Sequence, residues 1–70
     1  MKVYNFVKKL RKIYNVWEIY YAPRDVYEFW FHLENATVCL CYSGQTLRES
    51  THKDMLRRIE DDLKFYEEEK

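Results

Sequence analysis

The sequence has little glycine, proline or cysteine: its 70 residues include one Gly, one Pro and two Cys. One glycine leaves no room for a glycine-rich phosphate loop, and the chain has no P-loop, zincin helix or nucleophile elbow. No apolar run approaches the ~20 residues of a membrane span, and Met1-Lys2-Val3 does not open a secretory signal peptide. We therefore expect no enzyme activity and no membrane partner.

The two cysteines, Cys39 and Cys41, are separated by one residue. A disulfide between such neighbours on one strand face is strained, because it needs Cα atoms about 5.5–6 Å apart. This favours a reducing, cytoplasmic location. His32 is expected opposite Cys39, but Cys-x-Cys lacks the usual spacing of zinc ligands, and a catalytic cysteine would need a cleft. We expect no metal, no cofactor and no catalytic residue.

What the chain does have is aromatic residues, at 19%, within an apolar fraction of 47%. A chain of this length forms one small domain, here residues 1–70, and a domain of that size buries only about 60% of its unfolded surface. Large aromatic side chains are an efficient way to fill such a core.

The apolar periodicity changes twice along the chain. A spacing of three and four from Val3 predicts a helix ending near Asn15, and a similar stripe from Met55 to Tyr66 predicts a last helix capped by Ser50 or Thr51. Between them, residues 17–21, 27–34 and 37–42 alternate with period two. The sequence therefore predicts an α+β domain of order αβββα, with a three-stranded antiparallel meander and both helices on one sheet face.

The alternation also predicts which side chains face the helices. The inward set is expected to be Trp17, Ile19, Phe29, Phe31, Val38 and Leu40. A two-residue turn at Asn35-Ala36 would pair Leu33 with Val38. Residues 45–49 are expected to form either a short edge strand or a loop.

The opposite sheet face is the first candidate site. Tyr20 and Trp30 would stand there among polar residues, a composition typical of interface anchors. A partner protein, a second copy of the chain, or a loop of the chain itself such as residues 45–49 would cover them.

Charge is segregated although the net charge is +0, with twelve Lys plus Arg against twelve Asp plus Glu. An acidic end gathers Glu60, Asp61, Glu67, Glu68 and Glu69. Glutamates at a helix C-terminus oppose the macrodipole, so local helix stability does not explain them. They are either a solvated tail or an anionic surface for a basic groove on a host protein, such as one that binds nucleic acid.

An alternative is nucleic-acid binding. Helix, three strands and helix is also the element order of the double-stranded RNA-binding domain. Lys53, Arg57 and Arg58 lie near the start of the last helix, roughly where that family contacts phosphates. A small structural homodimer is a third interpretation.

The opening helix from Met1 to Leu10, the alternating runs and the acidic residues 60–69 together resemble small phage-encoded inhibitors, particularly type II anti-CRISPR proteins. The resemblance implies a non-enzymatic protein that occupies a surface of a host nuclease. We accordingly expect a protein-binding inhibitor whose contacts come from the acidic end and the aromatic sheet face.

Overall fold

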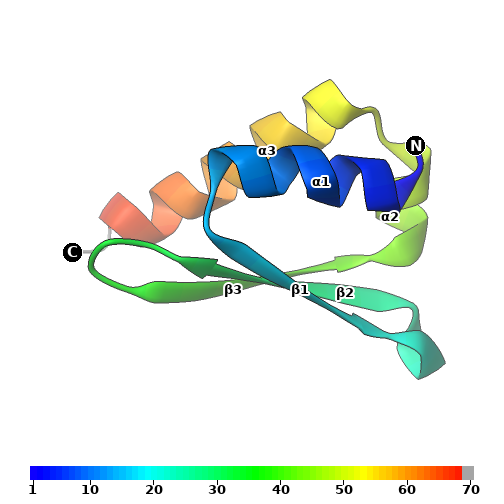
Figure 1. Ribbon diagram of the computed structural model, residues 1–70, viewed down its shortest axis with the longest axis horizontal. Coiled ribbons are helices and arrows are strands. Elements are labelled where there is room, and N and C mark those ends of the chain that lie inside the picture. Colours follow the sequence, from blue (N-terminus) through cyan, green and yellow to red (C-terminus); the bar gives the residue numbers. More distant parts are fainter. Residues whose placement is uncertain (69–70) are drawn as a thin grey trace.

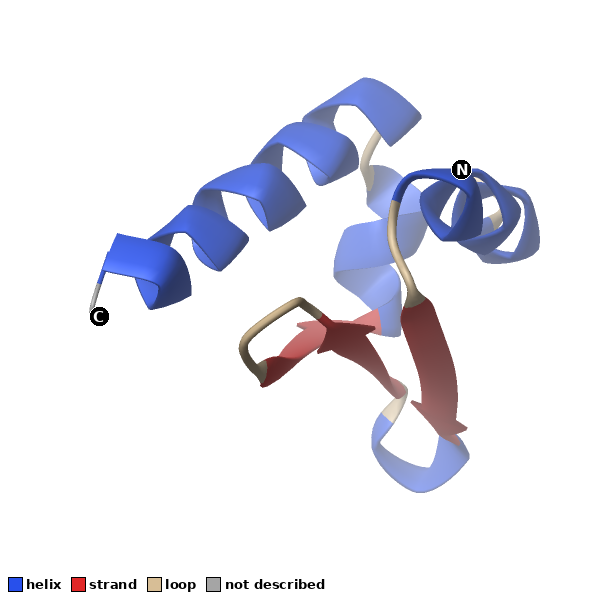
Figure 2. Ribbon diagram, turned by 60° about the vertical axis from the view of Figure 1, so that its left-hand side comes forward, coloured by secondary structure: helices blue, strands red, loops and turns tan. Residues whose placement is uncertain are grey.

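A three-stranded antiparallel sheet lies under two helices in the computed structural model, which describes residues 1–68 and the side chains of residues 1–66 (Figure 1). The strands β1 (Val16–Tyr21), β2 (Val26–His32) and β3 (Thr37–Ser43) are neighbours in that order. The helices α1 (Val3–Ile13) and α3 (His52–Glu68) both cover the same sheet face (Figure 2). The predicted α+β order αβββα is therefore confirmed.

Two short elements supplement this order: a 3₁₀ turn, η1 (Ala22–Arg24), and a helix, α2 (Gly44–Glu49). The expectation of a strand or loop at 45–49 was thus wrong. Ser43 caps α2, since its Oγ accepts a hydrogen bond from the N–H of Thr46 at 3.0 Å. Leu47 is fully buried against the core, which fixes the helix to the sheet.

The core lies between the helices and the sheet. Its buried apolar side chains are Phe6, Val7, Leu10, Val16, Phe29, Phe31, Val38, Leu40, Tyr42, Leu47, Met55, Ile59 and Leu63. They come from all three strands and all three α-helices, so each of these strands and helices is held in place by apolar burial. Among residues 1–68, no helix is both long enough and apolar enough to cross a bilayer.

The predicted cap of the last helix is confirmed. The N–H of Asp54 donates to Oγ1 of Thr51 at 3.1 Å, just before α3 begins at His52. Met55, Ile59 and Leu63 form the buried stripe, whereas Tyr66 at its end is 44% exposed.

The hairpin register differs from the prediction by two residues. Phe31 lies opposite Val38, and the two-residue loop is Glu34-Asn35, closed by a 2.9 Å bond from the N–H of Leu33 to the carbonyl of Ala36. A shift of two residues leaves every side chain on the same face. The apolar pattern could therefore not distinguish the two registers.

In β1, the side chains that face the helices are the opposite set from the one predicted. Val16 is 5% exposed and lies opposite Phe31, whereas Trp17 and Ile19 are 65% and 52% exposed. β1 carries large apolar side chains on both faces, so period two alone does not select the buried one. Only two residues separate α1 from β1, and Tyr14 packs edge-on against Phe31, which sets Val16 inward.

Candidate functional site

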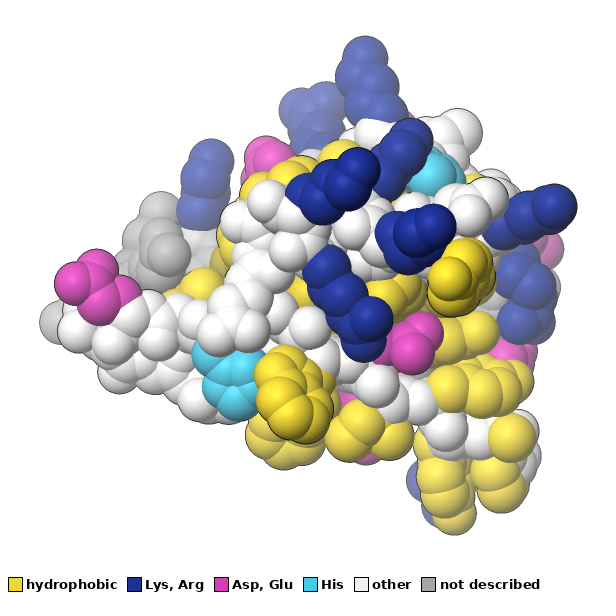
Figure 3. All heavy atoms as spheres, viewed as in Figure 1, with side chains coloured by type: hydrophobic (Ala, Val, Ile, Leu, Met, Phe, Trp, Pro, Cys, Tyr) yellow, Lys and Arg dark blue, Asp and Glu magenta, His cyan; other side chains and the backbone are white. Residues whose placement is uncertain are grey.

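The sheet side that faces away from the helices is the main candidate, and we call it the outer sheet face. From the strand pairing its residues are Trp17, Ile19, Tyr21, Val26, Glu28, Trp30, His32, Thr37, Cys39, Cys41 and Ser43. Glu28 is the one Asp, Glu, Lys or Arg among them. In Figure 3, hydrophobic side chains gather along the lower side of the molecule, where the sheet lies, and Lys and Arg gather over the helices.

An apolar strip crosses the outer sheet face. Trp17, Ile19 and Trp30 are 65%, 52% and 37% exposed. With His32 they line a shallow depression of about 240 Å³. The Trp17 and His32 rings meet edge-on at 6.0 Å, and Nε1 of Trp30 donates to Oε1 of Glu28 at 3.2 Å. These contacts fix the orientation of both indoles.

Tyr20 does not belong to this face, so its predicted role beside Trp30 was wrong. It lies on the helix side of the sheet, with its ring 4.4 Å from that of Tyr27. Its hydroxyl donates to Oδ1 of Asp25 at 2.8 Å, and this hydrogen bond raises the pKa of Tyr20. Trp17 and Ile19 take the place next to Trp30. The alternation of β1 contained that possibility, because Val16, Glu18 and Tyr20 form the complementary set.

Asp25 joins Tyr20 to Arg48. Arg48 Nη1 and Nη2 donate to the two carboxylate oxygens at 3.2 and 2.7 Å. The hydrogen bonds from Arg48, and then that from Tyr20, lower the pKa of the Asp25 carboxyl. This is the one ion pair within the described part of the chain.

Both cysteines lie on β3, where Cys39 is half-buried and Cys41 is exposed. Cys39 lies opposite Trp30 and not His32, as a result of the register shift, and its Sγ is 3.9 Å from that of Cys41. Burial, followed by the hydrogen bond with Cys41, raises the pKa of Cys39 to about 11. A thiol with that pKa is protonated near neutral pH. Among residues 1–66, no three His, Cys, Asp or Glu side chains come together as metal ligands.

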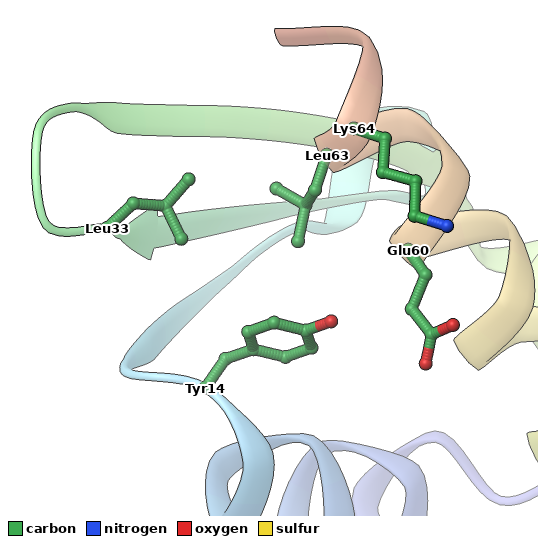
Figure 4. A pocket seen from close by; sticks show the side chains of 5 residues that line it. All are labelled: Tyr14, Leu33, Glu60, Leu63 and Lys64. Atoms are coloured by element: carbon green, nitrogen blue, oxygen red, sulfur yellow. The ribbon is translucent and has the colours of Figure 1, made fainter. Parts of the chain in front are cut away.

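Of the predicted acidic contacts, the structure describes the side chains of Glu60 and Asp61, which are neighbours on α3. Glu60 lines a depression of about 200 Å³ with Tyr14, Leu33, Leu63 and Lys64, shown in Figure 4. Asp61 is exposed. The side chains of Glu67 and Glu68, and the whole of Glu69, lie outside the described part.

The predicted basic residues at the start of α3 are Lys53, Arg57 and Arg58. The guanidinium of Arg58 lies 5.3 Å from the ring centre of Tyr42, toward β3, and the hydroxyl of Tyr42 donates to Oδ2 of Asp62. Lys53 and Arg57 are exposed and make no ion pair with any described residue. The structure therefore turns Arg58 toward β3, whereas Lys53 and Arg57, four residues apart, share one exposed side of α3.

Comparisons with protein-family models, curated proteins and solved structures gave no match.

Proposed function

We propose that the protein is a non-enzymatic protein-binding module that docks an apolar surface of a partner protein onto its outer sheet face. The observation that carries the proposal is the exposure of Trp17, Ile19 and Trp30 on a face with one charged side chain, Glu28. Interface cores are depleted in charge and enriched in aromatic residues, and tryptophan is frequent among the residues that dominate binding energy.

The same face is poorly suited to nucleic acid. Sheets that stack bases on aromatic rings combine them with cations that follow the phosphate backbone. No Lys or Arg is present on the outer sheet face. An apolar protein surface is the occupant that matches this composition.

The mode of action that we propose is inhibition of a host protein by occupying its surface, as in the anti-CRISPR inhibitors that the sequence resembles. Glu60 and Asp61 are exposed on α3, and Glu67, Glu68 and Glu69 extend the acidic end in sequence. An anionic end would accelerate encounter with a basic, nucleic-acid-binding partner.

The first test is capture of a partner from nuclease-treated host lysate by three tagged proteins. These are the wild type, the variant Trp17→Thr with Ile19→Thr, and a control, Tyr4→Ser with Phe65→Ser. The control removes two apolar side chains that are 72% and 59% exposed on the helices. A protein retained by the wild type and the control but lost from the sheet variant supports the proposal. Equal retention by all three contradicts it.

Sedimentation of the same proteins tests the competing occupant, a second copy. A monomeric wild type agrees with the proposal. A dimeric wild type that becomes monomeric only in the sheet variant would replace it with a structural homodimer.

A purified type II CRISPR nuclease tests the finer proposal. The expected result is binding that competes with target DNA. Reversal of charge at Glu67, Glu68 and Glu69 should slow association, most visibly at low salt. A nuclease that does not bind removes this identity for the partner but leaves the lysate test standing.

A further inference from the structure

A second surface, on the helix side, has a different chemistry. Asn5, Lys8, Lys9 and Lys12 of α1 line a depression of about 320 Å³ with His52, the first residue of α3. We call it the basic depression. Figure 3 shows Lys and Arg side chains gathered over α1 and α3, on the side opposite the sheet.

The helical spacing of α1 builds one wall of the basic depression. Asn5, Lys8, Lys9 and Lys12 are separated by three, one and three residues, so they share the outward face of the helix. Lys8 and Lys12 are about 6 Å apart along the axis. The other wall is held in place because the His52 ring packs edge-on against the buried Phe6 at 5.6 Å.

The charge of the basic depression is uncompensated within the described residues. No carboxylate lines it, and none of its lysines makes an ion pair. Cations this close on one helix face repel one another, at a cost of a few tenths of a kcal/mol per pair. The Nδ1 atom of His52 is buried and has no hydrogen-bond partner in the described part. Nζ of Lys8 lies 5.2 Å from the ring centre of Tyr4, but no described carboxylate neutralises the three ammonium groups, and an anion would do so.

We propose that the basic depression binds the phosphate backbone of nucleic acid, independently of the outer sheet face. Lysine ammonium groups contact phosphate as point charges, and several of them together neutralise successive phosphates along a strand. Among the described residues, the lining of the depression has no aromatic ring other than that of His52, which packs on Phe6, so the lining offers no free platform for base stacking. Recognition of the backbone without sequence preference follows.

An anionic membrane is the other polyanion to consider, and the packing of α1 argues against it. A helix that lies in a bilayer surface inserts its apolar face between lipids. The central apolar residues of α1, Phe6, Val7 and Leu10, are at most 5% exposed because they fill the core, and of its apolar side chains only those of Tyr4 and Ile13 are more than half exposed. The lysines also surround a hollow, which receives a protruding phosphate better than a flat surface.

The test is fluorescence polarisation with a labelled DNA duplex between about 50 and 200 mM salt. Three phosphate contacts predict a log–log salt slope of about −2.7, a loss of affinity of about 40-fold over that range. The variant Lys8→Gln, Lys9→Gln and Lys12→Gln should bind at least tenfold more weakly at the low salt, by about 1.4 kcal/mol or more, with a nearly flat slope. The matched control Arg11→Gln, Arg24→Gln and Lys64→Gln removes the same charge outside the depression and should retain the wild-type slope.

Three outcomes would overturn the proposal. They are no binding of the wild type to duplex at low salt, equal weakening by both triple variants, or binding to phosphatidylserine vesicles but not to duplex. If the lysine variant does not fold, an NMR titration of the wild type tests the site instead. Duplex must then shift the ring-nitrogen resonances of His52 in an NMR titration and leave those of His32 unchanged; unchanged His52 signals refute the site.

Discussion

Gly44 lies against Asp25 so closely that a Cβ on the glycine would be 2.1 Å from Oδ1 of the carboxylate. The N–H of Gly44 also donates to the carbonyl of Asp25 at 2.7 Å. Asp25 adopts a left-handed conformation, with φ 51°, and holds both Tyr20 and Arg48. The one glycine in the chain therefore lies where the end of the η1 turn meets the start of α2.

Replacement of Gly44 by Ala should destabilise the protein, because the added methyl would push the Asp25 carboxylate and Nη1 of Arg48 apart. Gly44 is the first residue of α2 and has no positive φ, so its backbone does not require glycine, and a loss of stability identifies the steric contact. Urea unfolding measures the difference.

The control for the glycine is a double-mutant cycle. In an Asp25→Ala background the methyl meets no carboxylate, and Gly44→Ala should cost clearly less than in the wild type. The same cost in both backgrounds would show that Asp25 is not what excludes a side chain at Gly44.

The lowered pKa of Asp25 leads to a prediction for how the free energy of unfolding changes at acid pH. Its folded pKa is lowered by Arg48 first and by Tyr20 second, so the unfolded chain binds the proton more tightly. The stabilisation from Asp25 is therefore present above its unfolded pKa of about 3.9 and is lost as pH falls through the lower folded value. In melting curves from about pH 5 down to pH 2, Asp25→Asn should show a weaker pH dependence than the wild type, since Asn retains the left-handed conformation. Parallel pH profiles would refute this assignment.

The elements of the fold could be predicted from sequence where one side of the pattern was polar. α1 and α3 each have one apolar stripe, and their positions were correct. The prediction of the inward face of β1 was wrong, because Val16 on one face and Trp17 on the other satisfy period two equally well. The prediction missed α2 because six residues are too short to show a helical period, although Ser43 is of a residue type that favours the N-cap position.

The candidate site could be predicted only in part. Trp30 was placed on the outer face correctly, because its neighbours Phe29 and Phe31 are both fully buried. Its neighbours on that face follow from the inter-strand pairing, which depends on β1 and on the turn hydrogen bond at Leu33. Long-range pairing of this kind is not encoded in local alternation. The basic depression likewise needs the position of α3 relative to α1.

Tyr42 supplies a third prediction, because it is buried and its hydroxyl donates to the Asp62 carboxylate. Tyr42→Phe should cost about 1.5–3 kcal/mol, the usual range for a hydrogen bond to a charged group. Tyr66→Phe, at a ring that is 44% exposed, should change the free energy of unfolding little.

The pH dependence of the free energy of unfolding is a second test of the role of Tyr42. Burial first, and the bond to Asp62 second, raise the pKa of Tyr42. The stabilisation is complete below the unfolded tyrosine pKa of about 10 and is lost as pH rises above it. Alkaline unfolding of Tyr42→Phe should therefore be less steep than that of the wild type. An unchanged alkaline profile would mean that Tyr42 ionises as readily in the folded protein as in the unfolded one.

The reactivity of the cysteines tests the expectation that the outer sheet face carries no catalytic nucleophile. Burial raises the pKa of Cys39 to about 11, so its thiolate is scarce near neutral pH. In Cys41→Ser, the remaining Cys39 should react with iodoacetamide at about pH 8 tenfold or more slowly than the same variant unfolded in urea, where the thiol pKa is about 8.5. Cys39→Ser, which leaves the exposed Cys41, is the control and should lose much less reactivity on folding. If Cys39 reacted faster in the folded protein than in urea, the face would hold an activated thiol, and the protein would have to be reconsidered as an enzyme.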